Sequence, residues 1–217
     1  MRDHGNNIAA RGTLLESIVF QSLRKSEFQR QPVANLPFIQ PVPPGWWEKT
    51  KFSCEHVLRH HELDISTAMF LRSKNPPTLL CPETTARPDG ILMLDNEHAM
   101  TFAVTIWTGL VPQHKVKSQE SSTSMNLAYC TQAGDVNSNC VKQRNEWEAA
   151  GLDTVKSVRV HIELPHAAKT KGVRVQGNEL LVSLNKSNIH HLVGRDENLR
   201  MLLAAATNTD EEGWYTQ

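Results

Sequence analysis

Two carboxylates in separate parts of the chain are of the kind that could hold a divalent metal ion. Glu16 lies in the segment GTLLESIVFQSLRK at residues 12–25, and Asp89 follows a proline and precedes the apolar run GILML at residues 90–94. Mg²⁺ takes carboxylate oxygens as ligands and keeps several of its waters. The sequence therefore predicts a candidate Mg²⁺ site at Glu16 and Asp89.

Each carboxylate also has an ordinary structural interpretation. The tetrapeptide RPDG at residues 87–90 is a strong turn signal, and a glutamate in a helix most often faces solvent. Apolar residues recur through residues 12–25 with a helical period, and Glu16 stands three residues before Val19 and four before Phe20. This spacing places Glu16 at the edge of the apolar stripe, and both interpretations stay open.

The residues after Asp89 predict a β-hairpin. Two apolar runs, residues 90–94 and 100–107, are joined by a polar turn, and the first is apolar enough to be buried on both faces. Metal-dependent phosphodiester cleavage also needs a group that positions and deprotonates the attacking water, often a lysine near the metal.

This order of parts resembles the restriction-endonuclease-like fold. In that family a helix supplies a glutamate, a Pro-Asp strand supplies the metal-binding aspartate, and the next strand supplies an acid-x-lysine pair. FAVTIWTGLVPQHKVK (102–117), SVRVHIELP (157–165) and ELLVSLNKSNIHHLV (179–193) are similar to segments of the nuclease-like domain of Crinkler and retrotransposon hot spot proteins. The resemblance covers residues 12–110 by motif and reaches about residue 195 by element order.

The sequence departs from that family where the acid-x-lysine pair belongs. The pair would fall on Ala103 and Thr105 or on Thr105 and Trp107, so neither an acid nor a lysine is present. Thr105 could offer one weak oxygen ligand, and Lys115 or Lys117 could reach the site only if the loop that carries them folds back. The candidate catalytic set of Glu16, Asp89, Thr105 and Lys115 is thus an incomplete centre.

Basic residues gather on two later strand candidates and the loop between them. SVRVHIEL (157–164) alternates apolar and polar residues, which predicts a strand with one apolar and one polar face. If the polar faces align, they form a positive stripe that could contact phosphates, although a solvated sheet face looks similar and Glu163 and Glu179 dilute the charge. The candidate nucleic-acid-binding residues are Lys156, Arg159, His161, Lys169, Lys171 and Arg174.

The predicted fold class is α/β, a mixed central sheet flanked by helices, similar to the restriction-endonuclease-like core. We expect one domain over residues 1–217, with a proline-rich arm at 31–47 that Trp46 and Trp47 pack down, and a polar tail at 208–217. Further helices are predicted at 124–132 and 139–151, near 187–193 and from Asp196 onward. SCEHVLRHHEL (53–63) is predicted as a helix and 66–72 as a strand.

The composition and charge of the chain limit the partners and the cellular compartment that we expect. Lys plus Arg and Asp plus Glu are both 23, so net charge indicates no polyanionic partner, and no apolar stretch suits a membrane span. The N-terminus lacks a secretory signal, so we expect an intracellular protein of the nucleus or cytoplasm. The four cysteines are scattered and predict buried thiols; Cys54 with His56, His60 and His61 is the closest approach to a zinc signature.

Three functions remain open from the sequence. The first is a nuclease-like domain with an incomplete catalytic centre, retained for binding nucleic acid or a protein partner. The second is an active Mg²⁺-dependent nuclease with a rearranged site. The third is a scaffold subunit that docks onto a protein partner through its proline-rich arm and tryptophan pair.

Overall fold

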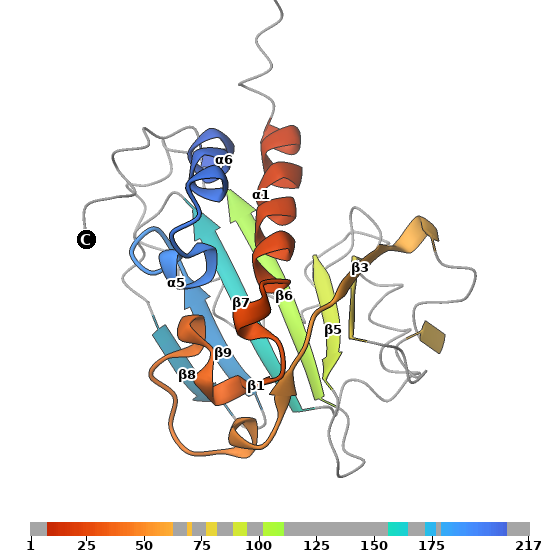
Figure 1. Ribbon diagram of the computed structural model, residues 1–217, viewed down its shortest axis with the longest axis vertical. Helices are drawn as coiled ribbons and strands as arrows, with labels where there is room; N and C mark the ends of the chain where they lie inside the picture. The colour runs from red at the N-terminus through yellow and green to blue at the C-terminus, as the bar shows by residue number, and fades with distance from the viewer. Residues whose placement is uncertain are drawn as a thin grey trace, which may run out of the picture.

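The computed structural model describes residues 8–62, 69–70, 77–81, 89–94, 102–110, 156–164, 172–176 and 179–207. Their centre is a seven-stranded mixed sheet in the order β3-β4-β5-β6-β7-β9-β8. The helices α1 (Ile8–Leu23), α5 (His190–Val193) and α6 (Glu197–Thr207) lie on one face of this sheet (Figure 1), which we call the α1 face. Mixed α/β architecture, the coarse form of the predicted fold class, is therefore confirmed.

The sheet combines both strand directions. Pairing is antiparallel between β4 and β5, β5 and β6, and β8 and β9, and it is parallel between β3 and β4, β6 and β7, and β7 and β9. The bounds are β3 (His56–Arg59), β4 (Thr78–Cys81), β5 (Gly90–Leu94), β6 (Phe102–Leu110), β7 (Lys156–Leu164), β8 (Gly172–Gln176) and β9 (Glu179–Leu184).

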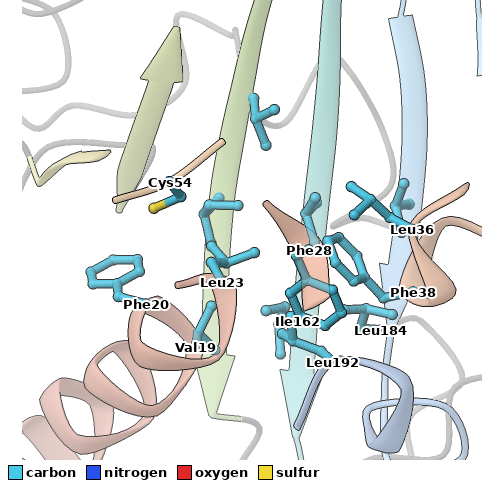
Figure 2. Packing of buried hydrophobic residues seen from close by; sticks show 14 of the residues in the cluster. Val19, Phe20, Leu23, Phe28, Leu36, Phe38, Cys54, Ile162, Leu184 and Leu192 are labelled. Carbon is cyan, nitrogen blue, oxygen red and sulfur yellow. The ribbon is translucent and has the colours of Figure 1, made fainter. Parts of the chain in front are cut away.

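The apolar core lies between the α1 face and its helices. Successive side chains of a strand alternate between the two faces, and the register aligns apolar positions of β6, β7 and β9 in cross-strand rows. One such row joins Ile106, Val160 and Val182, all buried. Figure 2 shows Val19 and Leu23 of α1 and Leu192 of α5 pointing into this core. The apolar stripe of α1 that the sequence predicts is thus the surface that fixes the helix to the sheet.

The proline-rich segment folds onto this same core. It begins with β1 (Gln31–Pro32), which pairs with β2 (Lys51–Phe52), and runs through three short 3₁₀ helices. These are η3 (Val33–Asn35), η4 (Pro37–Ile39) and η5 (Trp46–Glu48). Val33, Leu36, Phe38, Ile39 and Trp47 are buried.

The tryptophan pair anchors the end of that segment. The rings of Trp46 and Trp47 meet edge to face with centroids 5.4 Å apart, and Trp47 Nε1 donates a hydrogen bond to the Pro43 carbonyl at 2.7 Å. A Cβ on Gly45 would overlap the Trp47 ring, at 2.3 Å from its nearest atom. The prediction that the tryptophans pack this segment down is confirmed.

Other local predictions have mixed outcomes. The hairpin β5–β6 and the two C-terminal helices are confirmed. Strands β8 and β9 form a second antiparallel pair, with Gln176 opposite Glu179. The predicted helix over 53–63 is wrong, because His56–Arg59 form strand β3 paired to β4 and His60–Glu62 form a 3₁₀ turn. Met69 and Phe70 are helical, against the strand predicted there. The helices predicted at 124–132 and 139–151, and the tail 208–217, lie outside the described residues.

Candidate functional site

Helix α1 crosses the sheet close to the point where β5 begins. A Cβ added to Gly90 would stand 3.0 Å from a Phe20 ring carbon and 3.3 Å from Leu79 Cδ1. Glycine therefore allows α1 and β5 to approach, since any side chain would push Phe20 away. Glu16 lies one helical turn before Phe20 and Asp89 directly precedes Gly90, so this approach brings both carboxylates to one end of the α1 face.

The Asp89 carboxylate is held by β6. Its Oδ2 accepts hydrogen bonds from the Thr108 N–H at 2.5 Å and from the Thr108 hydroxyl at 2.9 Å, and the Asp89 N–H donates to the Ile106 carbonyl at 2.8 Å. Thr108 lies two residues after Ile106, whose buried side chain belongs to the core. Asp89 is thus oriented toward the α1 face by the strand that follows it in the hairpin.

The candidate residue Thr105 occupies a different place in the sheet. It pairs in register with Ile91 of β5 and Arg159 of β7, whereas Asp89 contacts Thr108. The residue that β6 offers to Asp89 is therefore Thr108, a hydroxyl that stabilises the carboxylate and supplies neither an acid nor a lysine. Lys115 and Lys117 lie outside the described residues.

The charges of Glu16 and Asp89 both act on the buried thiol of Cys81. Burial raises the pKa of Cys81 to about 12; the charge of Arg59 acts against this, and the charges of Glu16, Cys54 and Asp89 add to it. A carboxylate raises a thiol pKa only when it lies near enough to repel the thiolate. Glu16 and Asp89 therefore share one electrostatic environment beside Cys81, together with the Arg59 guanidinium.

Strand register explains why Arg59 and Cys81 meet. They are the last residues of the parallel strands β3 and β4 and are direct partners in the ladder. Val57, two residues before Arg59, packs against the main core, while Leu58 packs against the cluster on the opposite face. Alternation thus places Arg59 on the α1 face.

Cys54 is a second buried thiol beside this site. Burial raises its pKa to about 12, and its N–H donates to Gln29 Oε1 at 2.6 Å. Figure 2 shows Cys54 in the same buried cluster as Phe20. Both Cys54 and Cys81 are buried free thiols, which confirms for these two the prediction that the cysteines are small buried residues. Cys130 and Cys140 lie outside the described residues.

A metal at this end of the sheet would depend on few protein ligands. Within the parts of the chain that the structure describes, no group of three or more His, Cys, Asp or Glu could hold a metal ion. The zinc alternative also loses its geometry, because His56 is on strand β3 and not one helical turn from His60. Glu16 and Asp89 would be the protein ligands of an Mg²⁺ ion here, with the remaining positions left to water and substrate oxygens.

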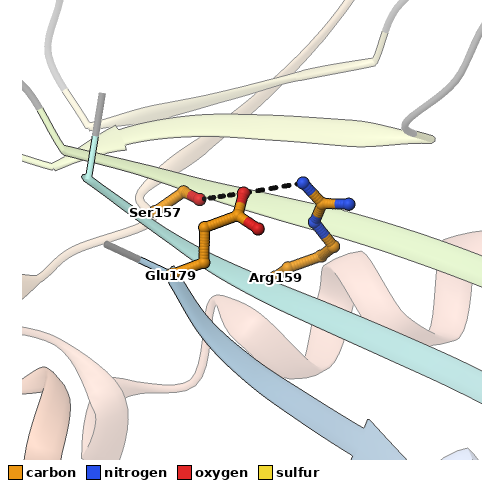
Figure 3. A network of polar contacts seen from close by, with 3 residues as sticks. All are labelled: Ser157, Arg159 and Glu179. Carbon is orange, nitrogen blue, oxygen red and sulfur yellow. Dashed lines mark hydrogen bonds and ion pairs between the residues drawn. The ribbon is translucent and has the colours of Figure 1, made fainter. Parts of the chain in front are cut away.

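The second sequence-predicted site, the basic stripe, is not formed as expected. Arg159 is 7% exposed, and its Nη2 pairs with Glu179 Oε1 at 2.7 Å, an oxygen that also accepts from the Ser157 hydroxyl at 2.9 Å (Figure 3). His161 is also buried. The prediction of a polar, solvent-facing side on β7 is wrong because β7 is a central strand covered on both faces.

The other members of the stripe are dispersed or not described. Arg174 on the edge strand β8 is exposed, and Lys156 at the start of β7 is half-buried. Lys169 and Lys171 lie outside the described residues. No continuous basic surface can therefore be drawn from the described part of β7 and β8.

Searches against protein-family models, curated proteins and solved structures found no match to this chain. Among the described helices, none has the length and apolar character needed to cross a membrane.

Sequence reasoning missed three residues of the site, which are Arg59, Cys81 and Thr108. Cys81 and Arg59 are 22 positions apart and meet only because β3 and β4 pair in parallel. Thr108 lies just past the run 100–107 that predicts the second strand. The longer extent of β6, to Leu110, is what places its hydroxyl beside Asp89.

Proposed function

We propose that this chain is a nuclease-like domain with an incomplete catalytic centre, retained for binding nucleic acid or a protein partner. One observation supports it most: helix α1 and the start of β5 bring Glu16 and Asp89 to the same thiol, while β6 presents Thr108 to Asp89. The order helix, Pro-Asp strand and adjacent strand is that of the restriction-endonuclease-like core, which we propose as the finer fold.

The chemistry of the site argues for binding over cleavage. Two carboxylates can hold a hydrated Mg²⁺ ion loosely and through it a phosphate. Hydrolysis also needs a group that takes a proton from the attacking water. The Thr108 hydroxyl is a poor base at neutral pH, and here it donates a hydrogen bond to Asp89. The alternative of an active nuclease would require a base from residues outside the described part, such as Lys115.

The scaffold alternative is weakened by the packing of the proline-rich segment. A docking arm needs apolar side chains available to a partner. In this chain Leu36, Phe38 and Trp47 are instead buried in the chain's own core. Nucleic acid is therefore the partner class that we test first.

Calorimetric titration of Mg²⁺ and Mn²⁺ tests the proposed metal site. The variants are Asp89→Asn, which keeps an acceptor for Thr108 but loses the charge, and Glu16→Gln, with exposed Glu48→Gln on η5 as the matched control. We expect the wild type and Glu48→Gln to bind the metal ions. Asp89→Asn and Glu16→Gln should bind them at least about tenfold more weakly, since each loses one of two charged ligands. Absence of metal binding in the wild type would contradict the proposal.

A parallel assay separates binding from cleavage. DNA and RNA oligonucleotides are incubated with the full protein chain and Mg²⁺. The fraction of oligonucleotide bound to the protein and the length of the oligonucleotide are both measured. Binding without shortening supports the incomplete centre. Mg²⁺-dependent shortening that disappears in Asp89→Asn would instead establish the active nuclease.

A further inference from the structure

The end of the α1 face that carries Glu16 and Asp89 also presents a cation that the nuclease resemblance does not assign. Arg59 ends β3, an outer strand of the described sheet, and its side chain is exposed. Its ladder partner is Cys81. In the next ladder, Leu80 pairs with Ile91 of the antiparallel strand β5. Cys81, which follows Leu80, therefore lies across from the start of β5, where Gly90 and Asp89 lie. Arg59 is therefore two strands from Gly90 along one row of the sheet, and Asp89 directly precedes Gly90.

The side chains of this row belong to one face. Val57 and Leu79, both packed in the main core, precede Arg59 and Cys81 by two residues each. Asp89 reaches the same face through its bonds to Thr108, and Glu16 projects from α1, the helix that covers it. The influence of Arg59, Glu16 and Asp89 on the Cys81 thiol agrees with this placement.

The Arg59 guanidinium is placed to take an anion. Its backbone N–H donates to Glu62 Oε2 at 2.6 Å, but within the described residues no hydrogen bond or ion pair engages its guanidinium. Two carboxylates and one guanidinium at the same end of the α1 face form a set that suits a phosphodiester with its metal. The carboxylates bind the cation, and the fork of N–H donors binds a phosphate oxygen pair that the cation also touches.

We propose that Arg59 is a phosphate-binding residue of this site and holds a nucleic-acid phosphodiester beside the metal bound by Glu16 and Asp89. This inference rests on the proposed function. It assigns to β3 the positive charge that the second strand of the hairpin lacks. A guanidinium cannot serve as a base at neutral pH, so Arg59 would bind and orient substrate without restoring hydrolysis.

Fluorescence anisotropy of labelled single-stranded DNA and RNA oligonucleotides of one sequence, with Mg²⁺ present, tests the proposal on the full chain. Arg59→Gln removes the charge, Arg59→Lys keeps the charge without the planar fork, and Arg195→Gln removes an exposed arginine between α5 and α6 as the matched control. The two oligonucleotides distinguish the two sources of the phosphodiester.

We expect Arg59→Gln to weaken binding about tenfold, since a hydrogen bond to a charged group contributes about that factor. Arg59→Lys should lie between this variant and the wild type, and Arg195→Gln should match the wild type. The slope of log Kd against log salt concentration should be smaller in Arg59→Gln, by about the contribution of one phosphate contact. An unchanged melting temperature of Arg59→Gln shows that the loss is not unfolding.

The outcomes separate this inference from the function beneath it. If the wild type and Arg59→Gln bind equally while Asp89→Asn loses binding, the role of Arg59 is overturned and the proposed function stands. If metal binds to the wild type but neither oligonucleotide does, the inference is overturned and the metal site stands. If Arg195→Gln weakens binding as much as Arg59→Gln, the effect is general charge, and the inference is again overturned.

Discussion

The two groups of charged residues that the sequence singles out lie on opposite faces of one sheet and differ in their surroundings. On the α1 face, Glu16 and Asp89 come from distant segments and approach the same thiol. On the other face, the basic residues of β7 form no open surface, because Arg159 is buried and pairs with Glu179. Arg159, in the middle of a central strand, is paired inside the protein, whereas Arg59, at the end of the outer strand β3, is exposed.

The physical reason is desolvation. A charge in the middle of a covered strand loses its hydration, and an opposite charge must compensate it. An exposed charge keeps its hydration and needs no such compensation. Arg59 at the end of β3 is exposed, whereas Arg159 within β7 is 7% exposed.

The largest effect that would test this comparison is the loss of one partner of the buried pair. Glu179→Ala leaves the Arg159 guanidinium without its carboxylate, and we expect the free energy of unfolding to fall by about 3–5 kcal/mol. Urea denaturation measures it, and the double variant Arg159→Met with Glu179→Leu should recover most of the loss. A change within about 0.5 kcal/mol, typical of a surface site, would contradict burial of the pair.

A substitution at Gly90 tests the close approach of α1 and β5. The added Cβ of Gly90→Ala would stand 3.0 Å from Phe20, so we expect a loss of about 1–3 kcal/mol in unfolding free energy from overpacking. Gly12→Ala on α1 is the control, because its Cβ would meet nothing within 4 Å, and there alanine should stabilise the helix by about 0.5–1 kcal/mol. Equal responses of both variants would argue against the packing that joins Glu16 to Asp89.

Thr108→Val tests the support of the Asp89 carboxylate. The variant keeps the backbone donor and removes the hydroxyl donor at 2.9 Å, so we expect a cost of about 1 kcal/mol, the net value of one hydrogen bond. In the background of Asp89→Ala the same substitution should cost much less, since the acceptor is already absent. Additive losses in that double-mutant cycle would show that Thr108 and Asp89 do not interact.

The smallest effect concerns the Cys81 thiol, which reports directly on the two carboxylates. Burial and the charges of Glu16 and Asp89 raise its pKa, against the charge of Arg59. Glu16→Gln should therefore lower the pKa of the Cys81 thiol, and Arg59→Gln should raise it. Carbon NMR of the Cys81 Cβ follows the titration; no response to Glu16→Gln would place that carboxylate away from the thiol.

The same pKa fixes the sign of a pH effect on stability. The folded thiol keeps its proton up to a pKa of about 12, above the ordinary value of 9.0. Between these values the unfolded chain binds fewer protons than the folded chain, so stability falls as pH rises through this window. Cys81→Ala should reduce that alkaline loss.

The sequence by itself determined the elements with strong periodicity and the roles that two carboxylates could take. The apolar period of α1, the hairpin β5–β6 and the strand β7 follow from local pattern, because helix and strand burial leave different repeats. The histidine-rich stretch at 53–63 gave no such repeat, and its helix prediction was wrong because pairing with β4 makes it a strand.

Only the tertiary structure decided which charges are buried and which are accessible. Alternation in β7 predicts one polar face but not whether that face is covered, because covering depends on distant segments. Likewise, neither Arg59 beside Cys81 nor Thr108 against Asp89 follows from any local pattern. These contacts depend on strand order and register, which are set by how the whole sheet buries its apolar surface.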